Sequence, residues 1–253
     1  MNRSLLAAAS RVESAIEKRL FAEYGSVFAT KAISPPVIIF EDHEAVDRFQ
    51  SLLSLEKGVF GDHEITLQSK AIEALKRAVA EMSKLGGSIT ARAADSGGRS
   101  YGDTVGLWAR NVTRGLEHWI DLGRISLERA DSIRQLSPKE QVSVILNLEE
   151  EEKLFFGTYF DRSILHSVAA PGASQHLSML AFDVAEYQDS RIDEVMARNG
   201  WHRTVINDLP HYTFLGYQEP ELSDLGLGRI FRTYGERVYS FWTPAVERLL
   251  DTD

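Results

Sequence analysis

The sequence predicts an α+β fold, with helices concentrated early in the chain and strands late. Apolar residues recur at helical spacing over residues 4–26, 66–85 and 101–119. Residues 176–184 and 211–215 instead form the short apolar or alternating runs that are typical of strands. The chain has 253 residues, which is enough to bury a substantial core, and no internal repeat or clear linker divides it.

The first half of the chain contains clear start and stop signals. The helix over residues 4–26 carries one apolar face, made by Leu5, Val12, Ile16 and Leu20. After Pro35-Pro36 we expect, in chain order, a strand over 37–40, a helix capped by Asp42 and ending near Leu53, the helix over 66–85 stopped by Gly86-Gly87, a strand over 88–92, a glycine-rich turn, and the helix over 101–119.

The second half begins with a helix opened by Ser137-Pro138, because proline is favoured in a first helical turn. This helix runs toward the acidic residues 149–152, which we interpret as a solvated helix face. The remaining predicted elements are a loop at Pro171-Gly172, a strand within 176–184, a helix near 191–199, a strand over 211–215 and a helix from about Pro244.

Composition excludes several classes of function. The net charge is −9 and the basic residues are scattered, which argues against binding to nucleic acid or to an anionic membrane. The absence of cysteine excludes disulfides, thiolate metal sites and cysteine nucleophiles. No apolar run approaches the ~20 residues of a membrane helix. The motifs of a serine-hydrolase elbow, a phosphate-binding loop and a dinucleotide-binding loop are also absent from the sequence.

Most of the seven histidines are expected to be ordinary surface or structural residues. His43 and His63 open "HEAVD" and "HEITL", which begin like a zinc-protease helix but lack the second histidine four residues on. We therefore expect both on the surface. His118 and His166 are predicted to be structural, and His202 is a minor candidate for lining a cleft.

His176 and Asp183 are more informative, because they bracket an apolar run. In a straight strand, residues seven apart stand ~23 Å apart. On a helix they stand ~10 Å apart along the axis. A common metal would require a sharp turn near Ser178-Met179, because zinc–ligand bonds measure only ~2.0–2.2 Å. Spacing alone favours a capping histidine and a strand-end aspartate and leaves the metal pair as the alternative.

Asp208 and His211 form the second candidate pair, in "NDLPHYTF". Pro210 restricts the residue before it, and His211 opens an alternating strand. Such a turn can place a metal ligand and a water-binding carboxylate in one cleft. An unrelated turn aspartate and strand-end histidine are the simpler alternative.

Three motifs occur in order, "SGGRS" (96–100), "PGASQHLSMLAFD" (171–183) and "DLPH" (208–211). They resemble the zinc D-alanyl-D-alanine carboxypeptidases of the VanY/VanX type and the related phage L-alanyl-D-glutamate endolysins. That family's pattern is Ser-Gly-Tyr-Arg-Ser, then Ser-x-His-x-x-Gly-x-Ala-x-Asp, then Glu/Asp-x-x-His. The match spans about residues 67–217. It implies a hedgehog/DD-peptidase-like α+β fold, in which a small antiparallel sheet carries a zinc site and packs against helices.

The resemblance also implies a role for each matching residue. The implied Zn2+ ligands are His176, Asp183 and His211, the implied catalytic residues are Asp208 and Arg99, and the implied substrate contacts are Ser174 and Ser100. Two histidines and one carboxylate leave a fourth zinc position open for water. Asp208 would be the general base, and Arg99 would face the developing oxyanion or hold a substrate carboxylate.

The function implied is a zinc metallopeptidase that hydrolyses peptidoglycan stem peptides at a D-Ala-D-Ala terminus. Asp208 stands where carboxypeptidases usually have glutamate, so an L-alanyl-D-glutamate endopeptidase is the first alternative. Gly98 replaces the family's tyrosine and Met179 its glycine. These two departures motivate a second alternative, a catalytically silent peptidoglycan-binding module on the same scaffold.

The resemblance leaves the beginning of the chain uncovered. We predict a helical extension over residues 1–65 and the peptidase domain over residues 66–253, with one continuous domain as the alternative. The inferred substrate implies a periplasmic or extracellular location. Glu13 and Glu17 interrupt the first apolar stretch too early for a signal peptide.

Overall fold

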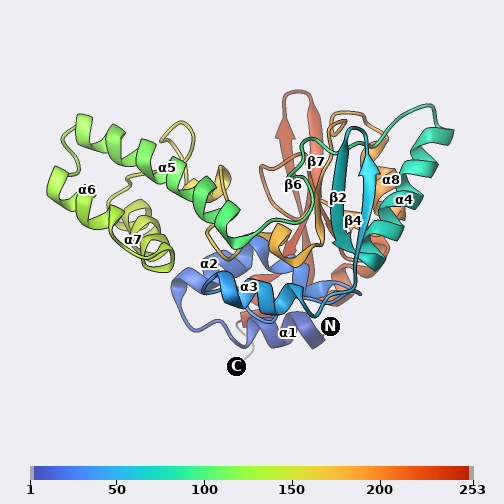
Figure 1. Cartoon of the computed structure of the whole chain (residues 1–253), viewed down its shortest axis with the longest axis horizontal. Coiled ribbons are helices and arrows are strands. Elements are labelled where there is room, and N and C mark those ends of the chain that lie inside the picture. The colour runs from blue at the N-terminus through green and yellow to red at the C-terminus, as the bar shows by residue number, and fades with distance from the viewer. Residues whose placement is uncertain (1–2, 251–253) are drawn as a thin grey trace. The chain divides into compact units, whose positions relative to one another are not determined.

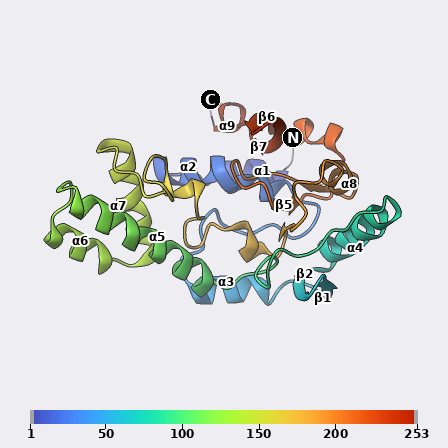
Figure 2. The same cartoon turned by 90° about the horizontal axis from the view of Figure 1, so that it is seen from above.

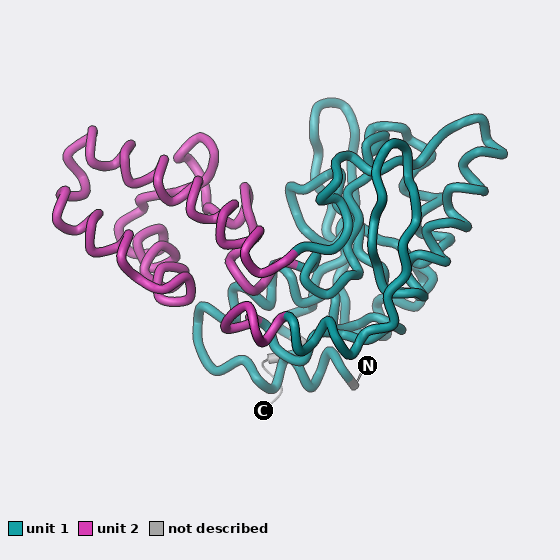
Figure 3. The backbone as a smooth tube through the Cα atoms, viewed as in Figure 1, with its two compact units in different colours: residues 1–38, 47–99, 175–253 teal, residues 39–46, 100–174 magenta. Residues whose placement is uncertain are grey.

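The computed structural model describes residues 3–250 and confirms a mixed α+β protein with small antiparallel sheets. The chain forms two compact units, which Figure 3 colours teal and magenta. Unit 1 contains described residues up to 38, then 47–99, and everything from 175 onward. Unit 2 contains residues 39–46 and 100–174. No helix in the described part of the chain is both long and apolar enough to cross a membrane.

Unit 1 holds all the strands of the described chain and the helices that pack on them (Figure 1). Its helices are α1 (Arg3–Ala9), α2 (Ala15–Tyr24), α4 (Ser69–Lys84), α8 (Ile192–Arg198) and α9 (Val246–Leu250), with 3-10 turns η1 (Gly25–Ala29), η3 (Gln175–Ser178), η4 (Glu219–Glu221) and η5 (Ser223–Leu225). Its strands are β1 (Leu55–Phe60), β2 (His63–Gln68), β3 (Ala181–Asp183), β4 (Trp201–His202), β5 (His211–Phe214), β6 (Leu227–Tyr234) and β7 (Arg237–Pro244).

Three small antiparallel sheets make up the β-structure of unit 1. β1 pairs with β2 and β6 with β7 as hairpins, whereas β5 lies between β3 and β4 in a three-stranded sheet. Aromatic side chains pack together on the strands of the three-stranded sheet. The Phe182 and Trp201 rings lie 6.3 Å apart, and the Trp201 and Phe214 rings 5.4 Å apart. β5 is buried along its whole length, so its side chains are held from both faces.

Unit 2 is helical and consists mainly of α5 (Tyr101–Asp121), α6 (Leu127–Arg134) and α7 (Pro138–Glu151), with the 3-10 turn η2 (Ile164–His166). The three helices lie side by side in both views (Figures 1 and 2). Trp108 and Trp119 are buried here, and their indole nitrogens donate to Gln141 Oε1 and to the Phe155 carbonyl oxygen. α3 (His43–Gln50) spans the boundary between the units, and the Asp42 carboxylate caps it by accepting from the Ala45 N–H.

The start signals of the helices are confirmed more often than their extents. Pro138 lies in the first turn of α7, behind a Ser137–Glu140 capping box. The predicted helix over residues 4–26 is two helices, because Ser14 begins a new one with its own capping box. Residues 37–40, predicted as a strand, form no strand, since 37–39 are bends, and residues 88–92 contribute only a single bridge from Ala91 to Val184.

The two hairpins and the burial of Glu149 differ from what the sequence predicted. β1–β2 and β6–β7 turn at Gly61 and Gly235, both with positive φ, and neither hairpin was expected. The domain boundary predicted at residue 65 falls inside β2, whose pairing with β1 joins the two sides of it. Glu149 belongs to no solvated face: it is 1% exposed and accepts from the Phe156 and Ile164 N–H groups and from the Ser163 hydroxyl.

Candidate metal centre

The chain between His176 and Asp183 makes the sharp turn that a common site requires. His176 lies in the 3-10 turn η3, and Asp183 ends the short strand β3. Between them Met179 adopts a left-handed backbone conformation with φ of 57°, and its N–H donates to the His176 carbonyl oxygen at 3.2 Å. This reversal leaves His176 Nε2 only 3.4 Å from Asp183 Oδ1. The interpretation favoured by spacing alone, two unrelated polar ends, is therefore wrong.

Met179 and Gly98, the two departures from the family pattern, lie against each other. A Cβ added to Gly98 would stand 1.8 Å from Met179 Sδ. The methionine sulfur therefore occupies space that any side chain at position 98 would need. The left-handed conformation costs a non-glycine residue on the order of 1–3 kcal/mol. Met179 is 9% exposed, and the burial of its side chain offsets part of that cost.

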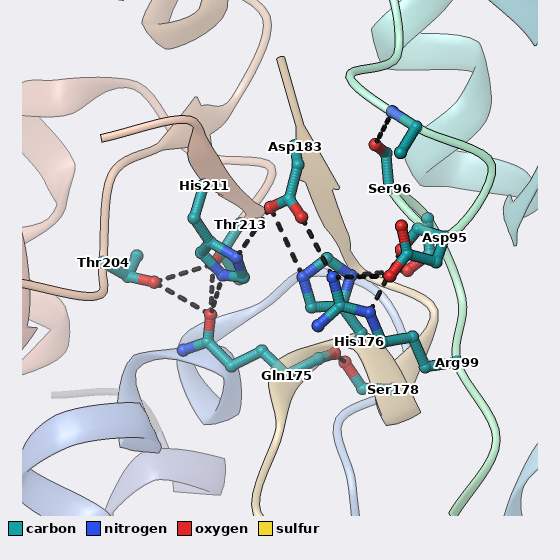
Figure 4. Close-up of polar contacts among 12 residues, drawn as sticks. Asp95, Ser96, Arg99, Gln175, His176, Ser178, Asp183, Thr204, His211 and Thr213 are labelled. Atoms are coloured by element: carbon teal, nitrogen blue, oxygen red, sulfur yellow. Dashed lines mark hydrogen bonds and ion pairs between the residues drawn. The ribbon is translucent and has the colours of Figure 1, made fainter. Parts of the chain in front are cut away.

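Strand pairing supplies the third member of the group. β5 places His211 directly opposite Asp183 in the antiparallel register, and His211 Nδ1 lies 3.2 Å from Asp183 Oδ1. Figure 4 shows both imidazole rings directed at the same carboxylate. One ligand atom from each of His176, Asp183 and His211 lies within 4.8 Å of the other two. This buried group can hold a metal ion.

Arg99 binds the other oxygen of the same carboxylate. Its Nη2 lies 3.1 Å from Asp183 Oδ2, and its Nε donates to the Asp95 carbonyl oxygen at 3.1 Å (Figure 4). The Arg99 N–H also donates to the His176 carbonyl oxygen at 3.3 Å. Arg99 thus restrains two members of the group, and Asp183 presents only Oδ1 to the histidines.

Burial and charge set the protonation of the group. Burial lowers the pKa of His176, although the Asp183 carboxylate opposes the shift, so the neutral imidazole is favoured. Burial would raise the pKa of Asp183, but His176 and His211 outweigh that effect and hold it well below its ordinary value. Neutral imidazoles beside an ionised carboxylate are the forms that bind metal ions.

Asp208 lies in the turn before β5, and its carbonyl oxygen accepts from the His211 N–H at 3.3 Å. Surrounding protein raises the pKa of its carboxyl, and the negative Asp183 adds to this, whereas His211, His176 and Arg99 lower it. Its side chain is nevertheless exposed to solvent, so the shift is smaller than full burial would produce. Asp208 is therefore a carboxylate that water can reach beside the metal-ligand group.

No protein-family model matches this chain, and no curated protein is significantly similar to it. The resemblance to the zinc carboxypeptidases therefore rests on the three motifs quoted above. The structure brings together the residues of those motifs that were assigned to metal and catalysis. The two serines assigned to substrate are placed differently.

Ser100 and Ser174 both belong to unit 2. Ser100 is the N-cap of α5, where its hydroxyl accepts from the Asp103 N–H and donates to the Asp103 carboxylate. Ser174 is buried and is the last residue of unit 2. Their roles in substrate binding stay predictions.

The other histidines lie away from the metal-ligand group or serve packing. His202 Nε2 lies 2.9 Å from the Tyr217 carbonyl oxygen, and the residue lines a cavity of about 400 Å³ whose lining contains none of the three candidate ligands. His118 stacks on Phe160 with ring centroids 4.1 Å apart. His63 belongs to β2, which the sequence did not predict.

Sequence reasoning missed Gln175, whose side chain contacts His211. Its Oε1 lies 2.9 Å from His211 Nε2, and it also accepts from Thr204 and Thr213 (Figure 4). Gln175 directly precedes a candidate ligand and falls on the variable position of Ser-x-His, where the family pattern specifies no residue. The threonines come from the chain after β4 and from β5, so no local spacing could have revealed the contact.

Proposed function

We propose that this protein is a zinc-dependent metallopeptidase that hydrolyses peptidoglycan stem peptides, of the D-Ala-D-Ala carboxypeptidase type. The observation that carries the proposal is the buried group of His176, Asp183 and His211 with Asp208 and Arg99 beside it. Burying a carboxylate and two imidazoles this closely is costly unless an ion or a proton joins them.

The spacing of the donor atoms fits zinc. Two ligands ~2.1 Å from a tetrahedral zinc ion stand ~3.4 Å apart. The nitrogens of His176 and His211 lie 3.4 Å and 3.2 Å from Asp183 Oδ1. Two neutral nitrogens and one carboxylate oxygen form a donor set that suits zinc and leaves a fourth position open.

Each residue would contribute a separate step to peptide hydrolysis. Zinc held by the three ligands supplies Lewis acidity and makes hydroxide available near neutral pH. Asp208 would take the proton of the attacking water and pass it to the leaving amine. Arg99 binds one carboxylate oxygen of Asp183, so that only the other oxygen would bind the metal. No described residue hydrogen-bonds to Nη1 of Arg99, and this nitrogen would donate to a substrate oxygen.

The L-alanyl-D-glutamate endopeptidase is the second candidate, because residues 208–211 read Asp-x-x-His. Mass spectrometry of digested muropeptides separates the two. Loss of a terminal alanine supports the carboxypeptidase, and release of whole stem peptides supports the endopeptidase. The silent binding module is not favoured, since Gly98 and Met179, which motivated it, fit each other sterically.

The decisive experiment measures zinc content and muropeptide hydrolysis in parallel. Wild-type protein should hold about one equivalent of zinc, which His176→Ala should lose together with activity. Asp208→Asn should keep the zinc but lose most hydrolysis. His118→Ala, which changes a histidine of unit 2, is the matched control and should keep both. Wild-type protein that holds far less than one equivalent of zinc, or full activity of His176→Ala, would rule the proposal out.

A further inference from the structure

Gln175 makes four side-chain hydrogen bonds, although it occupies a position of the second motif at which the family pattern specifies no residue. It is 3% exposed. Its amide Nε2 donates to the Tyr24 carbonyl oxygen at 2.8 Å. Its Oε1 accepts from the Thr204 hydroxyl at 3.0 Å and from the Thr213 hydroxyl at 2.5 Å, and faces His211 Nε2 at 2.9 Å.

These contacts favour a proton on Nε2 of His211. A backbone carbonyl oxygen can only accept, so Tyr24 orients the amide with its nitrogen outward and its oxygen toward His211. An amide oxygen carries no proton, so His211 Nε2 must be the donor in that contact. A neutral imidazole has one N–H, so in the neutral form of His211 the lone pair is on Nδ1.

The same reasoning applies to the other histidine. His176 Nδ1 lies 2.6 Å from the Gly97 carbonyl oxygen, which also can only accept. The proton is thus on Nδ1, and the lone pair is on Nε2, the atom 3.4 Å from Asp183 Oδ1. When both rings are neutral with these tautomers, electron pairs of His176 Nε2, His211 Nδ1 and Asp183 Oδ1 converge on one point. Such an arrangement is repulsive unless a metal ion or a further proton joins the three atoms.

We propose that Gln175 is a positioning residue that holds His211 in the Nε2–H tautomer and so presents Nδ1 to the metal. This inference rests on the proposed zinc site. Tyr24, Thr204 and Thr213 act through Gln175 by fixing its amide. Outer partners of this kind typically change metal affinity ~10–100-fold when they are removed.

Three variants and a direct view of the proton test the inference. Gln175→Met removes the acceptor at similar length, and Gln175→Glu keeps an oxygen facing His211. Gln68→Met is the matched control. Gln68 is also buried, and its amide donates to the Ile33 and Ser178 carbonyl oxygens but contacts neither histidine. Circular dichroism checks that each variant is folded.

The first readout is the tautomer of His211 in metal-free protein, from long-range ¹H–¹⁵N NMR at about pH 8, above the ordinary imidazole pKa of ~6.5. The wild type, Gln175→Glu and Gln68→Met should show the Nε2–H form, and Gln175→Met should show substantial Nδ1–H. The second readout is the zinc dissociation constant from chelator competition. It should rise ~10–100-fold in Gln175→Met, and less in Gln175→Glu and Gln68→Met.

An unchanged tautomer and an unchanged zinc affinity in Gln175→Met would overturn the inference while leaving the zinc site intact. Equal weakening in Gln175→Met and Gln68→Met, with no change of tautomer, would also overturn it. A wild-type protein that binds no zinc would instead overturn the proposed function. The tautomer comparison would then still decide whether Gln175 sets the proton of His211.

Discussion

Gly98 and Met179 should be energetically coupled, because the Met179 side chain fills the space that a side chain at position 98 would need. In wild-type protein, Gly98→Ala would place a Cβ 1.8 Å from Met179 Sδ and 2.7 Å from Met179 Cε. The methionine end must then move within a buried site. Overpacking of this kind costs ~1–3 kcal/mol, and the flexibility of methionine favours the lower part of that range.

The same substitution should destabilise the protein much less once the Met179 sulfur is removed. Gly98 is not among the glycines with positive φ, so alanine fits its backbone. In a Met179→Ala background, the closest remaining contact of the new Cβ is the Thr66 carbonyl oxygen at 3.3 Å. This contact is tight, and the restriction of the unfolded chain, which contributes ~0.4–1 kcal/mol, offsets its cost. The difference between the two backgrounds gives a coupling free energy of ~1–2 kcal/mol.

Urea unfolding of the wild type, both single variants and the double variant measures this coupling. The four tryptophans divide between the units, Trp201 and Trp242 in unit 1 and Trp108 and Trp119 in unit 2. 5-Fluorotryptophan labelling and ¹⁹F NMR therefore follow unit 1 separately from unit 2. Additive free energies of unfolding within ~0.5 kcal/mol would refute the reasoning.

Three further predictions concern stability. Glu149→Ala should lower the free energy of unfolding of unit 2 by ~3 kcal/mol, because two buried N–H groups lose a charged acceptor; Glu149→Gln should cost less, and equal costs would contradict this explanation. Ser137→Ala should cost ~1 kcal/mol through loss of the α7 cap, measured by the ¹⁹F signals of Trp108 and Trp119. Burial, opposed by Arg203 and reinforced by Asp193, raises the pKa of Tyr212 well above its ordinary value. The stabilisation from its neutral form is complete below the unfolded pKa of ~10 and is lost above it, by up to ~1.4 kcal/mol per pH unit. Tyr212→Phe should therefore show a shallower alkaline decline in urea unfolding, and parallel declines would exclude this role.

Local sequence signals located the starts of several helices. Pro138 and Ser137 mark the start of α7 because proline geometry and a capping hydroxyl act within one turn. The resemblance of the three motifs to a zinc-peptidase family implied His176, Asp183 and His211 as ligands, whereas spacing alone favoured unrelated polar residues. The hairpins β1–β2 and β6–β7 escaped prediction, because strand pairing depends on a partner more than on intrinsic preference.

Only the tertiary structure decided how the candidate ligands meet. By spacing, His176 and Asp183 were more easily explained as separate ends of a strand, and Met179 looked unsuited to the turn between them. The pairing of β3 with β5 sets His211 against Asp183, and the missing Cβ of Gly98 makes room for Met179. Gln175 contacts His211 because the fold brings together residues that are far apart in the sequence. A sequence supplies donor atoms at known positions, whereas the convergence of those atoms on one point depends on long-range packing and hydrogen bonding.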